Sequence, residues 1–147
     1  MAIRAIRGAT CLTANIAEEM NDAVAELIDQ MMIRNRVSSA QVISILLTGT
    51  PDLTCAFPAA GIRIHGLTDV PLMCAQEMNV VGALERVVRI MAQVETDQER
   101  SEVHHVYLRG AEVLRADLFD DSGQSGQSGQ SGQSGQSGQS GKDAQGA

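Results

Sequence analysis

The sequence predicts a mixed α/β or α+β fold in which about five strands, one long helix and one short helix form a single domain. Residues 3–12 alternate between two faces as a strand does. Through residues 16–35, apolar side chains recur at helical spacing. Several short apolar runs then follow and indicate further strands. Because two helices cover only one face of such a sheet, we expect the other face to pack against copies of the same chain, most simply in a symmetric ring.

The first strand and the long helix are the clearest predicted elements. Arg7 shares one face of the strand with small apolar residues, so it is either a strand-edge charge that reaches solvent or a residue that faces a site. Asn15 and Glu18 are spaced as a reciprocal N-terminal capping pair for the helix over residues 16–35. Carboxylates cover the outer face of this helix, which indicates a packing helix with a solvated acidic surface.

The remaining predicted elements are shorter. Residues 42–48 are apolar on both faces, which is typical of a central strand. Phe57 and Pro58 begin a short helix with proline at its first position, and Gly66 ends it. The later strands and the segment that closes the folded body are predicted at residues 70–74, 83–94, 103–108 and 113–115.

The chain divides into a domain over residues 1–118 and a tail over residues 119–147. Between residues 122 and 141 the tail repeats Ser-Gly-Gln without one apolar side chain. Such a segment buries no surface that would offset the entropy of ordering it, so we expect it to be disordered. We expect it to have no function.

Composition excludes several classes of function. A net charge of −7 argues against a nucleic-acid partner, which favours a basic surface. The sequence has no apolar run long enough to span a bilayer and begins without a signal peptide. The three cysteines are an odd number without metal-like spacing, which predicts reduced thiols in a cytoplasmic protein. The three histidines also lack zinc spacing, so no metal site is predicted.

The candidate site depends on arginines. Four of them lie on or beside separate predicted elements, three near apolar strands, in an otherwise acidic protein. Arginine binds carboxylates through two parallel hydrogen bonds, so this set predicts a site for a small polyanion, most naturally a dicarboxylate. Glu77 could accept a hydrogen bond from a substrate hydroxyl, and Tyr107 could donate one. The pattern does not name a reaction. The four arginines are Arg7, Arg63, Arg89 and Arg115.

These residues lie in segments that resemble the monofunctional, AroH-class chorismate mutases. The resemblance covers essentially all of residues 1–118, in order and with similar gaps. It implies a homotrimer of pseudo-α/β-barrel form with active sites at the three subunit interfaces. It also implies conversion of chorismate to prephenate, on the route to phenylalanine and tyrosine, without metal or cofactor. The matching segments include Ile3-Arg4-Ala5-Ile6-Arg7-Gly8-Ala9-Thr10, Thr50-Pro51-Asp52-Leu53, Ala56-Phe57-Pro58-Ala59, Val70-Pro71-Leu72-Met73-Cys74-Ala75-Gln76-Glu77-Met78, Arg89-Ile90-Met91 and His105-Val106-Tyr107-Leu108.

The resemblance also implies roles for individual residues. Arg89 would donate to the ether oxygen and a carboxylate of chorismate, and Arg7 would bind the side-chain carboxylate. Glu77 and Cys74 would hold the ring hydroxyl, and Tyr107 would help to seat the enolpyruvyl carboxylate. Strict alternation places Cys74 and Glu77 on opposite faces, so we expect the chain to bulge or turn between them.

Other residues would complete each site from elsewhere. By the same resemblance, Phe57 and Arg63 would come from the neighbouring subunit. Leu114 and Arg115 would lie in a C-terminal segment that closes over the pocket. Ala60 departs from the family, in which relatives can have a lysine at this position, so a basic contribution to steering is absent here.

Two other classes of function remain open at the level of the residues. One is a trimer of the imine-deaminase (YjgF-like) family, which has interface pockets and an arginine for carboxylates; such a trimer would bind small keto or imino acids. Against it, the set of Cys74, Glu77, Arg89 and Tyr107 is particular to the mutases. The other is a structural or sensor module whose arginines only pair with acidic residues across an interface. Calorimetry with a dicarboxylate similar to prephenate would separate the last class from the first.

Overall fold

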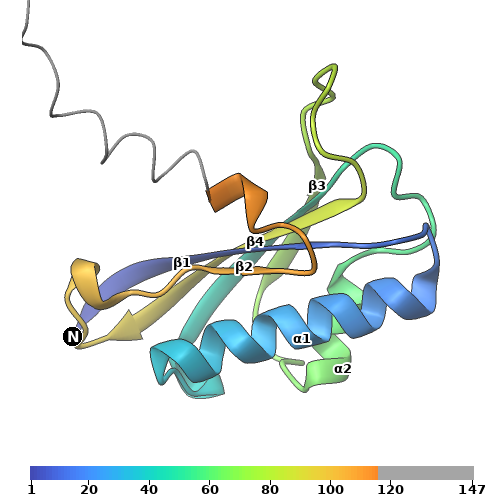
Figure 1. Cartoon of the computed structure of the whole chain (residues 1–147). Helices are drawn as coiled ribbons and strands as arrows, with labels where there is room; N and C mark the ends of the chain where they lie inside the picture. The colour runs from blue at the N-terminus through green and yellow to red at the C-terminus, as the bar shows by residue number, and fades with distance from the viewer. Residues whose placement is uncertain (116–147) are drawn as a thin grey trace, which may run out of the picture.

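The computed structural model describes residues 1–115, which form one mixed sheet with both α-helices on the same face (Figure 1). In chain order the elements are β1 (Ala2–Cys11), α1 (Ala17–Asn35), the 3-10 turn η1 (Ser39–Gln41), β2 (Val42–Gly49), α2 (Ala59–His65), β3 (Leu72–Gln76), β4 (Val87–Thr96), the 3-10 turn η2 (Arg100–Glu102) and β5 (Val106–Leu108).

The five strands lie in the order β3-β2-β4-β1-β5. β4 runs antiparallel to both of its neighbours, β1 and β2, whereas β3 and β5 are each parallel to the strand beside them. The predicted α+β class, with about five strands, one long helix and one short helix, is confirmed, and a further helical turn that was not predicted begins at Val113. The predicted domain end at residue 118 and the predicted tail at 119–147 lie outside the described residues.

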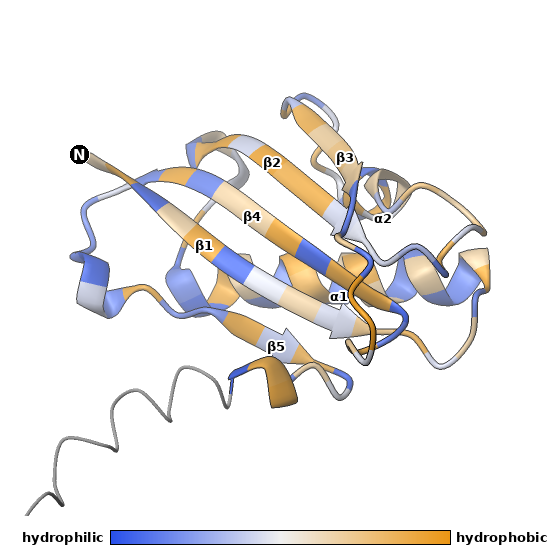
Figure 2. Cartoon of the chain, turned by 90° about the horizontal axis from the view of Figure 1, so that it is seen from above, coloured by the Kyte–Doolittle hydropathy of each residue, from blue (hydrophilic) through white to orange (hydrophobic). Residues whose placement is uncertain are grey.

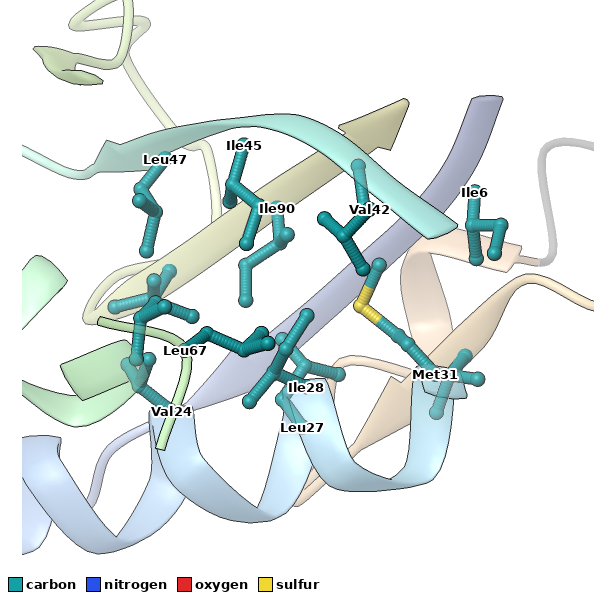
Figure 3. Packing of buried hydrophobic residues seen from close by; sticks show 14 of the residues in the cluster. Ile6, Val24, Leu27, Ile28, Met31, Val42, Ile45, Leu47, Leu67 and Ile90 are labelled. Atoms are coloured by element: carbon teal, nitrogen blue, oxygen red, sulfur yellow. The ribbon is translucent and has the colours of Figure 1, made fainter. Parts of the chain in front are cut away.

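The main core lies between the sheet and α1. Alternate side chains of the central strands, such as Ile6, Leu47 and Ile90, point toward α1, which contributes Val24, Leu27 and Met31 to the same layer (Figure 3). Each of these side chains is at most 2% exposed. The core is built from aliphatic residues and methionine, whose shapes fill the layer between helix and sheet.

The start of α1 differs from the prediction. Its N-cap residue is Ile16, which makes no side-chain capping hydrogen bond. The Asn15 carboxamide instead turns away from the helix, and the acidic partner of the preceding turn is Glu19 rather than Glu18. Glu19 accepts hydrogen bonds from the backbone N–H groups of Thr13 and Ala14. The predicted capping pair is therefore wrong, because loop contacts satisfy Asn15 better than the helix terminus does.

Three strands begin later than predicted, and β3 begins at Leu72 rather than at residue 70. β4 begins at Val87 rather than at residue 83, because Arg86 has a positive φ of 51° and Gly82 one of 81°. Such left-handed conformations interrupt an extended strand. β5 begins at Val106 rather than at residue 103. Residues 78–86 form instead a long connection that rises from the end of β3 and returns to β4 (Figure 1).

The sheet face opposite α1 and α2, called here the open face, is lined by strands of mixed hydropathy (Figure 2). It exposes apolar side chains on four strands, one after another: Ile3, Met91, Leu46 and Met73. Near β5, however, a second small core forms where Ala111 and Leu114 pack against Tyr107. The open face thus remains uncovered in its middle and is covered at one end by the last described residues. Within residues 1–115, no helix is long and apolar enough to cross a membrane.

Candidate active site

Strand register places four residues in one row across the open face. Thr48 on β2 lies opposite Arg89 on β4, and Arg89 lies opposite Ala9 on β1. Ala9 in turn lies beside Tyr107 on β5. Because side chains of paired residues point to the same face, the row brings the Arg89 guanidinium and the Tyr107 ring to the same side, with only the Ala9 methyl group between them.

Glu77 joins this row from the end of β3. Its backbone N–H donates to the Gly49 carbonyl at 2.9 Å, which extends the parallel ladder by one residue beyond the strand. One carboxylate oxygen, Oε2, accepts a hydrogen bond of 2.9 Å from the Thr48 hydroxyl and lies 3.3 Å from Arg89 Nε. The predicted carboxylate and arginine, twelve positions apart in the sequence, therefore form an ion pair.

Two polar atoms of this site have no hydrogen-bond acceptor among the described residues. Arg89 Nε is at ion-pair distance from Glu77 but makes no aligned hydrogen bond, and the Tyr107 hydroxyl has no hydrogen bond of any kind. Both atoms are buried. A buried polar group without a partner costs about 1–3 kcal/mol, so such atoms are rare and call for an explanation. A ligand or a second subunit that supplies acceptors would provide one.

Arg7 adds a second positive charge to the same face. Its guanidinium carbon lies 6.0 Å from the centre of the Tyr107 ring, at the outer limit of a cation–π contact. Its backbone N–H donates to Nδ1 of His105 at 3.0 Å. Burial lowers the pKa of His105, and the positive charges of Arg7 and Arg115 lower it further. The imidazole is therefore neutral at physiological pH and able to accept this hydrogen bond.

The predicted C-terminal residues lie beside this group. Leu114 packs against the small core that contains Tyr107 and Ala9. Arg115 is close enough to His105 to affect its pKa. Arg7, Glu77, Arg89, Tyr107, Leu114 and Arg115 thus lie on or beside the open face.

The other three predicted residues lie elsewhere on the same subunit. Phe57, Arg63 and Cys74 line an open groove of about 710 Å³ between α2 and the outer edge of β3. The Phe57 ring is 79% exposed. Cys74 packs on the helix side of the sheet, whereas Glu77 lies on the open face. The expected bulge or turn between them is not observed, because the β2–β3 ladder continues to Glu77 and alternation is kept.

Sequence reasoning missed two positions that organise the site. Thr48 carries no charge and sits in an apolar strand, so nothing in the sequence pointed to its contact with Glu77. Asn15 holds the segment that leads to Phe57, because its Oδ1 accepts from the N–H groups of Thr54 and Cys55 at 3.0 Å each. Over residues 1–115, no three His, Cys, Asp or Glu side chains come together in a way that could hold a metal ion.

Comparisons with known proteins show which family the chain belongs to. Residues 3–118 match the family described as chorismate mutase type I. The chain is 40% identical over 119 residues to the chorismate mutase AroH of Bacillus subtilis, covering 80% of this chain and 94% of that protein. It is 41% identical over 117 residues to the chorismate mutase AroH of Thermus thermophilus, covering 79% and 96% of the two chains.

A solved structure is also similar. The chorismate mutase from Clostridium thermocellum superposes with a TM-score of 0.74 at 42% sequence identity, and the match covers 76% of this chain and 99% of that one. The arginine-rich site on an α+β sheet is typical of a protein that binds a small anion. The comparisons identify the family within this broad class. The chain belongs to the chorismate mutase type I family.

Proposed function

We propose that this protein catalyses the rearrangement of chorismate to prephenate, and that the row Thr48–Arg89–Ala9–Tyr107 with Glu77 is one wall of its active site. The observation that carries the proposal is the buried Arg89 Nε, which lies beside a carboxylate yet has no aligned hydrogen-bond acceptor within residues 1–115. In a member of this family, that N–H group can donate a hydrogen bond to the bound substrate. The imine-deaminase alternative finds no support among the relatives compared above.

The reaction asks the protein for orientation and electrostatics. Chorismate has two carboxylates, a ring hydroxyl and an enolpyruvyl ether, and its rearrangement breaks one C–O bond and forms one C–C bond in the same molecule. No proton is transferred and no nucleophile is consumed. The protein must therefore select the folded conformer and stabilise the negative charge that develops on the ether oxygen as the C–O bond breaks.

The geometry supports a role for each residue of the open face. Arg89 donates to the ether oxygen and to one carboxylate, and Arg7 binds the side-chain carboxylate. Glu77 accepts a hydrogen bond from the ring hydroxyl. At the same time it orients the Arg89 guanidinium, because its Oε2 lies 3.3 Å from Arg89 Nε. The Tyr107 hydroxyl, which has no partner in the described residues, donates to the enolpyruvyl carboxylate.

We further propose a homotrimer in which each site is shared by two subunits. Two features support this arrangement: the uncovered apolar middle of the open face, and the separation of the predicted residues into two groups on one subunit. Phe57 and Arg63 would then face the open-face group of a neighbour. Cys74 lines the same groove as these two residues, so we assign it to the neighbour's contribution as well. Leu114 and Arg115 close the pocket from the C-terminal side.

The test is a chorismate absorbance assay with product identification. The purified chain should consume chorismate and release prephenate, and sedimentation should give three times the subunit mass. A chain that leaves chorismate unchanged above the uncatalysed rate would overturn the proposal. We also expect the protein to act in the cytoplasm, a proposal supported by three cysteines that are all free thiols.

A further inference from the structure

The inference concerns the hydroxyl of Thr48, a side chain in the middle of an apolar strand. Its Oγ1 lies 2.9 Å from Glu77 Oε2 and donates a hydrogen bond to it. The same oxygen is the one that faces Arg89 Nε at 3.3 Å. No hydrogen bond to the other oxygen, Oε1, is formed among the described residues. A single carboxylate oxygen is therefore shared by a hydroxyl and a guanidinium, and the second oxygen is left for another partner.

This arrangement differs from the one that an arginine and a carboxylate adopt when nothing restrains them. Such a pair closes into two parallel N–H···O hydrogen bonds, which satisfy both groups. Here the pair is only half closed, because Arg89 Nε makes no aligned hydrogen bond. Glu77 follows directly on β3 and Thr48 lies on the adjacent β2, opposite Arg89, so the strand register fixes the hydroxyl beside the carboxylate. Thr48 is β-branched, which restricts the rotation of its side chain.

We propose that Thr48 is a positioning residue for the rearrangement: its hydroxyl holds the Glu77 carboxylate in the half-closed state. This keeps Arg89 available for the ether oxygen and Oε1 available for the ring hydroxyl. Without the hydroxyl, the carboxylate rotates into a closed pair with Arg89 and both groups turn away from the substrate. The inference rests on the proposed function of the open-face site, which assigns no role to Thr48.

The experiment compares two substitutions at this position. Thr48→Val keeps the shape and removes the hydroxyl, whereas Thr48→Ser keeps the hydroxyl. Loss of a hydrogen bond to a charged group should lower the kcat of the Val variant about tenfold or more. KM should change less, because the charge on the ether oxygen appears only in the transition state. The Ser variant should keep kcat within about threefold of the original chain.

A second background shows whether Thr48 acts through Glu77. In Glu77→Ala the hydroxyl has nothing to hold, so adding Thr48→Val should change kcat by less than about twofold. An equal loss in both backgrounds, or a Val variant with full activity, overturns the inference. If Thr48→Val does not fold, Thr48→Ala gives the same comparison with a smaller side chain.

A structural readout separates this inference from the proposed function. Crystals of Thr48→Val should show two short contacts between the Glu77 carboxylate and the Arg89 guanidinium, where the original chain has one at 3.3 Å. An unchanged carboxylate overturns the inference even if the enzyme is active. If the original chain does not consume chorismate, the proposed function fails, while the position of the carboxylate still decides whether Thr48 holds it.

Discussion

Arg89 Nε lies 3.3 Å from Glu77 Oε2 and is buried, yet it makes no aligned hydrogen bond to any residue that the structure describes. The two side chains are each about one-third exposed or less. Because the Nε–H group is buried, its interaction with a ligand is less screened by water than it would be at an open surface. A preorganised donor of this kind is what stabilises charge that appears only during a reaction.

Replacement of Arg89 should remove most of the activity. Loss of one preorganised donor to developing charge lowers the rate by about 10²–10³, so Arg89→Ala should lose that much kcat. Arg89→Lys should recover only part of it, because an ammonium group cannot make two parallel hydrogen bonds. Arg34→Ala, an exposed arginine at the end of α1, serves as the matched control and should leave kcat unchanged. Normal turnover by Arg89→Ala would contradict the assignment.

Tyr107→Phe should separate activity from stability. The substitution removes a buried hydroxyl that has no partner in the described residues, so the ligand-free protein should melt at the same temperature or slightly higher. KM for chorismate should rise by about tenfold if the hydroxyl donates to a carboxylate, because a hydrogen bond to a charged group contributes about 1.5–3 kcal/mol. Thermal melting without ligand and steady-state kinetics measure the two effects. A lower melting temperature with unchanged KM would show that the hydroxyl is structural.

The pairing of Glu77 with Arg89 could be predicted from the sequence, because a charge inside an apolar strand requires a partner. The five strands and the long helix could be predicted for a similar reason, since their apolar periodicity follows directly from the packing of a sheet on a helix. Strand register, in contrast, depends on pairings between residues far apart in sequence. The row that joins Arg89 to Tyr107 through Ala9 therefore emerged only from the structure.

Local polar chemistry was the weaker part of the prediction. Asn15 has the spacing of a helix cap, but its carboxamide satisfies three groups of a loop some forty residues away. Sequence spacing alone does not show whether Asn15 caps the helix or binds the loop, because the loop's donors belong to a distant segment. The same holds for Thr48, whose contact with Glu77 depends on two strands that lie side by side.

The two explanations of Asn15 can be compared by mutation. Asn15→Ala should destabilise the fold by about 0.5–1.5 kcal/mol, because the exposed N–H groups of Thr54 and Cys55 lose their shared acceptor to water. It should also raise KM, since the released segment leads to Phe57. Asn15→Asp keeps the acceptor and should be milder. Glu18→Ala is the control and should stay within about 0.5 kcal/mol, as expected for an exposed side chain without a capping role. A larger effect of Glu18→Ala in urea denaturation would restore the predicted capping pair.

Stability should depend on pH through His105. Burial, followed by the charges of Arg7 and Arg115, lowers the pKa of this histidine from its ordinary value of 6.5. The unfolded chain therefore binds a proton at a pH where the folded chain does not, so stability rises with pH in this window. The contribution is fully present above pH 6.5 and is lost as pH falls through the lower, folded pKa. Urea denaturation at several pH values between 5 and 7.5 gives the free energy of unfolding as a function of pH. This free energy should rise less steeply with pH for His105→Gln, and an unchanged pH dependence would assign the effect to other groups.

The contact between the two helices gives the last prediction. A methyl group at Gly61 on α2 would lie 2.6 Å from Cβ and 2.8 Å from Cγ1 of Val24 on α1, distances at which one helix must move. Such overpacking costs about 1–3 kcal/mol, so Gly61→Ala should destabilise the fold by at least this amount.

The matched control is Gly66→Ala, which has open space around it but a φ of 111°, so its effect should come from backbone strain alone. Val24→Ala removes the Cγ1 contact at 2.8 Å but keeps the Cβ contact at 2.6 Å, so it should relieve only a small part of the loss in Gly61→Ala and none of the loss in Gly66→Ala. Because the Asn21 carbonyl would still lie 3.0 Å from the new methyl group, relief should be incomplete. Equal coupling of Val24→Ala with both glycine variants would contradict this account, and it would mean that α2 is not seated on α1 as closely as these distances require.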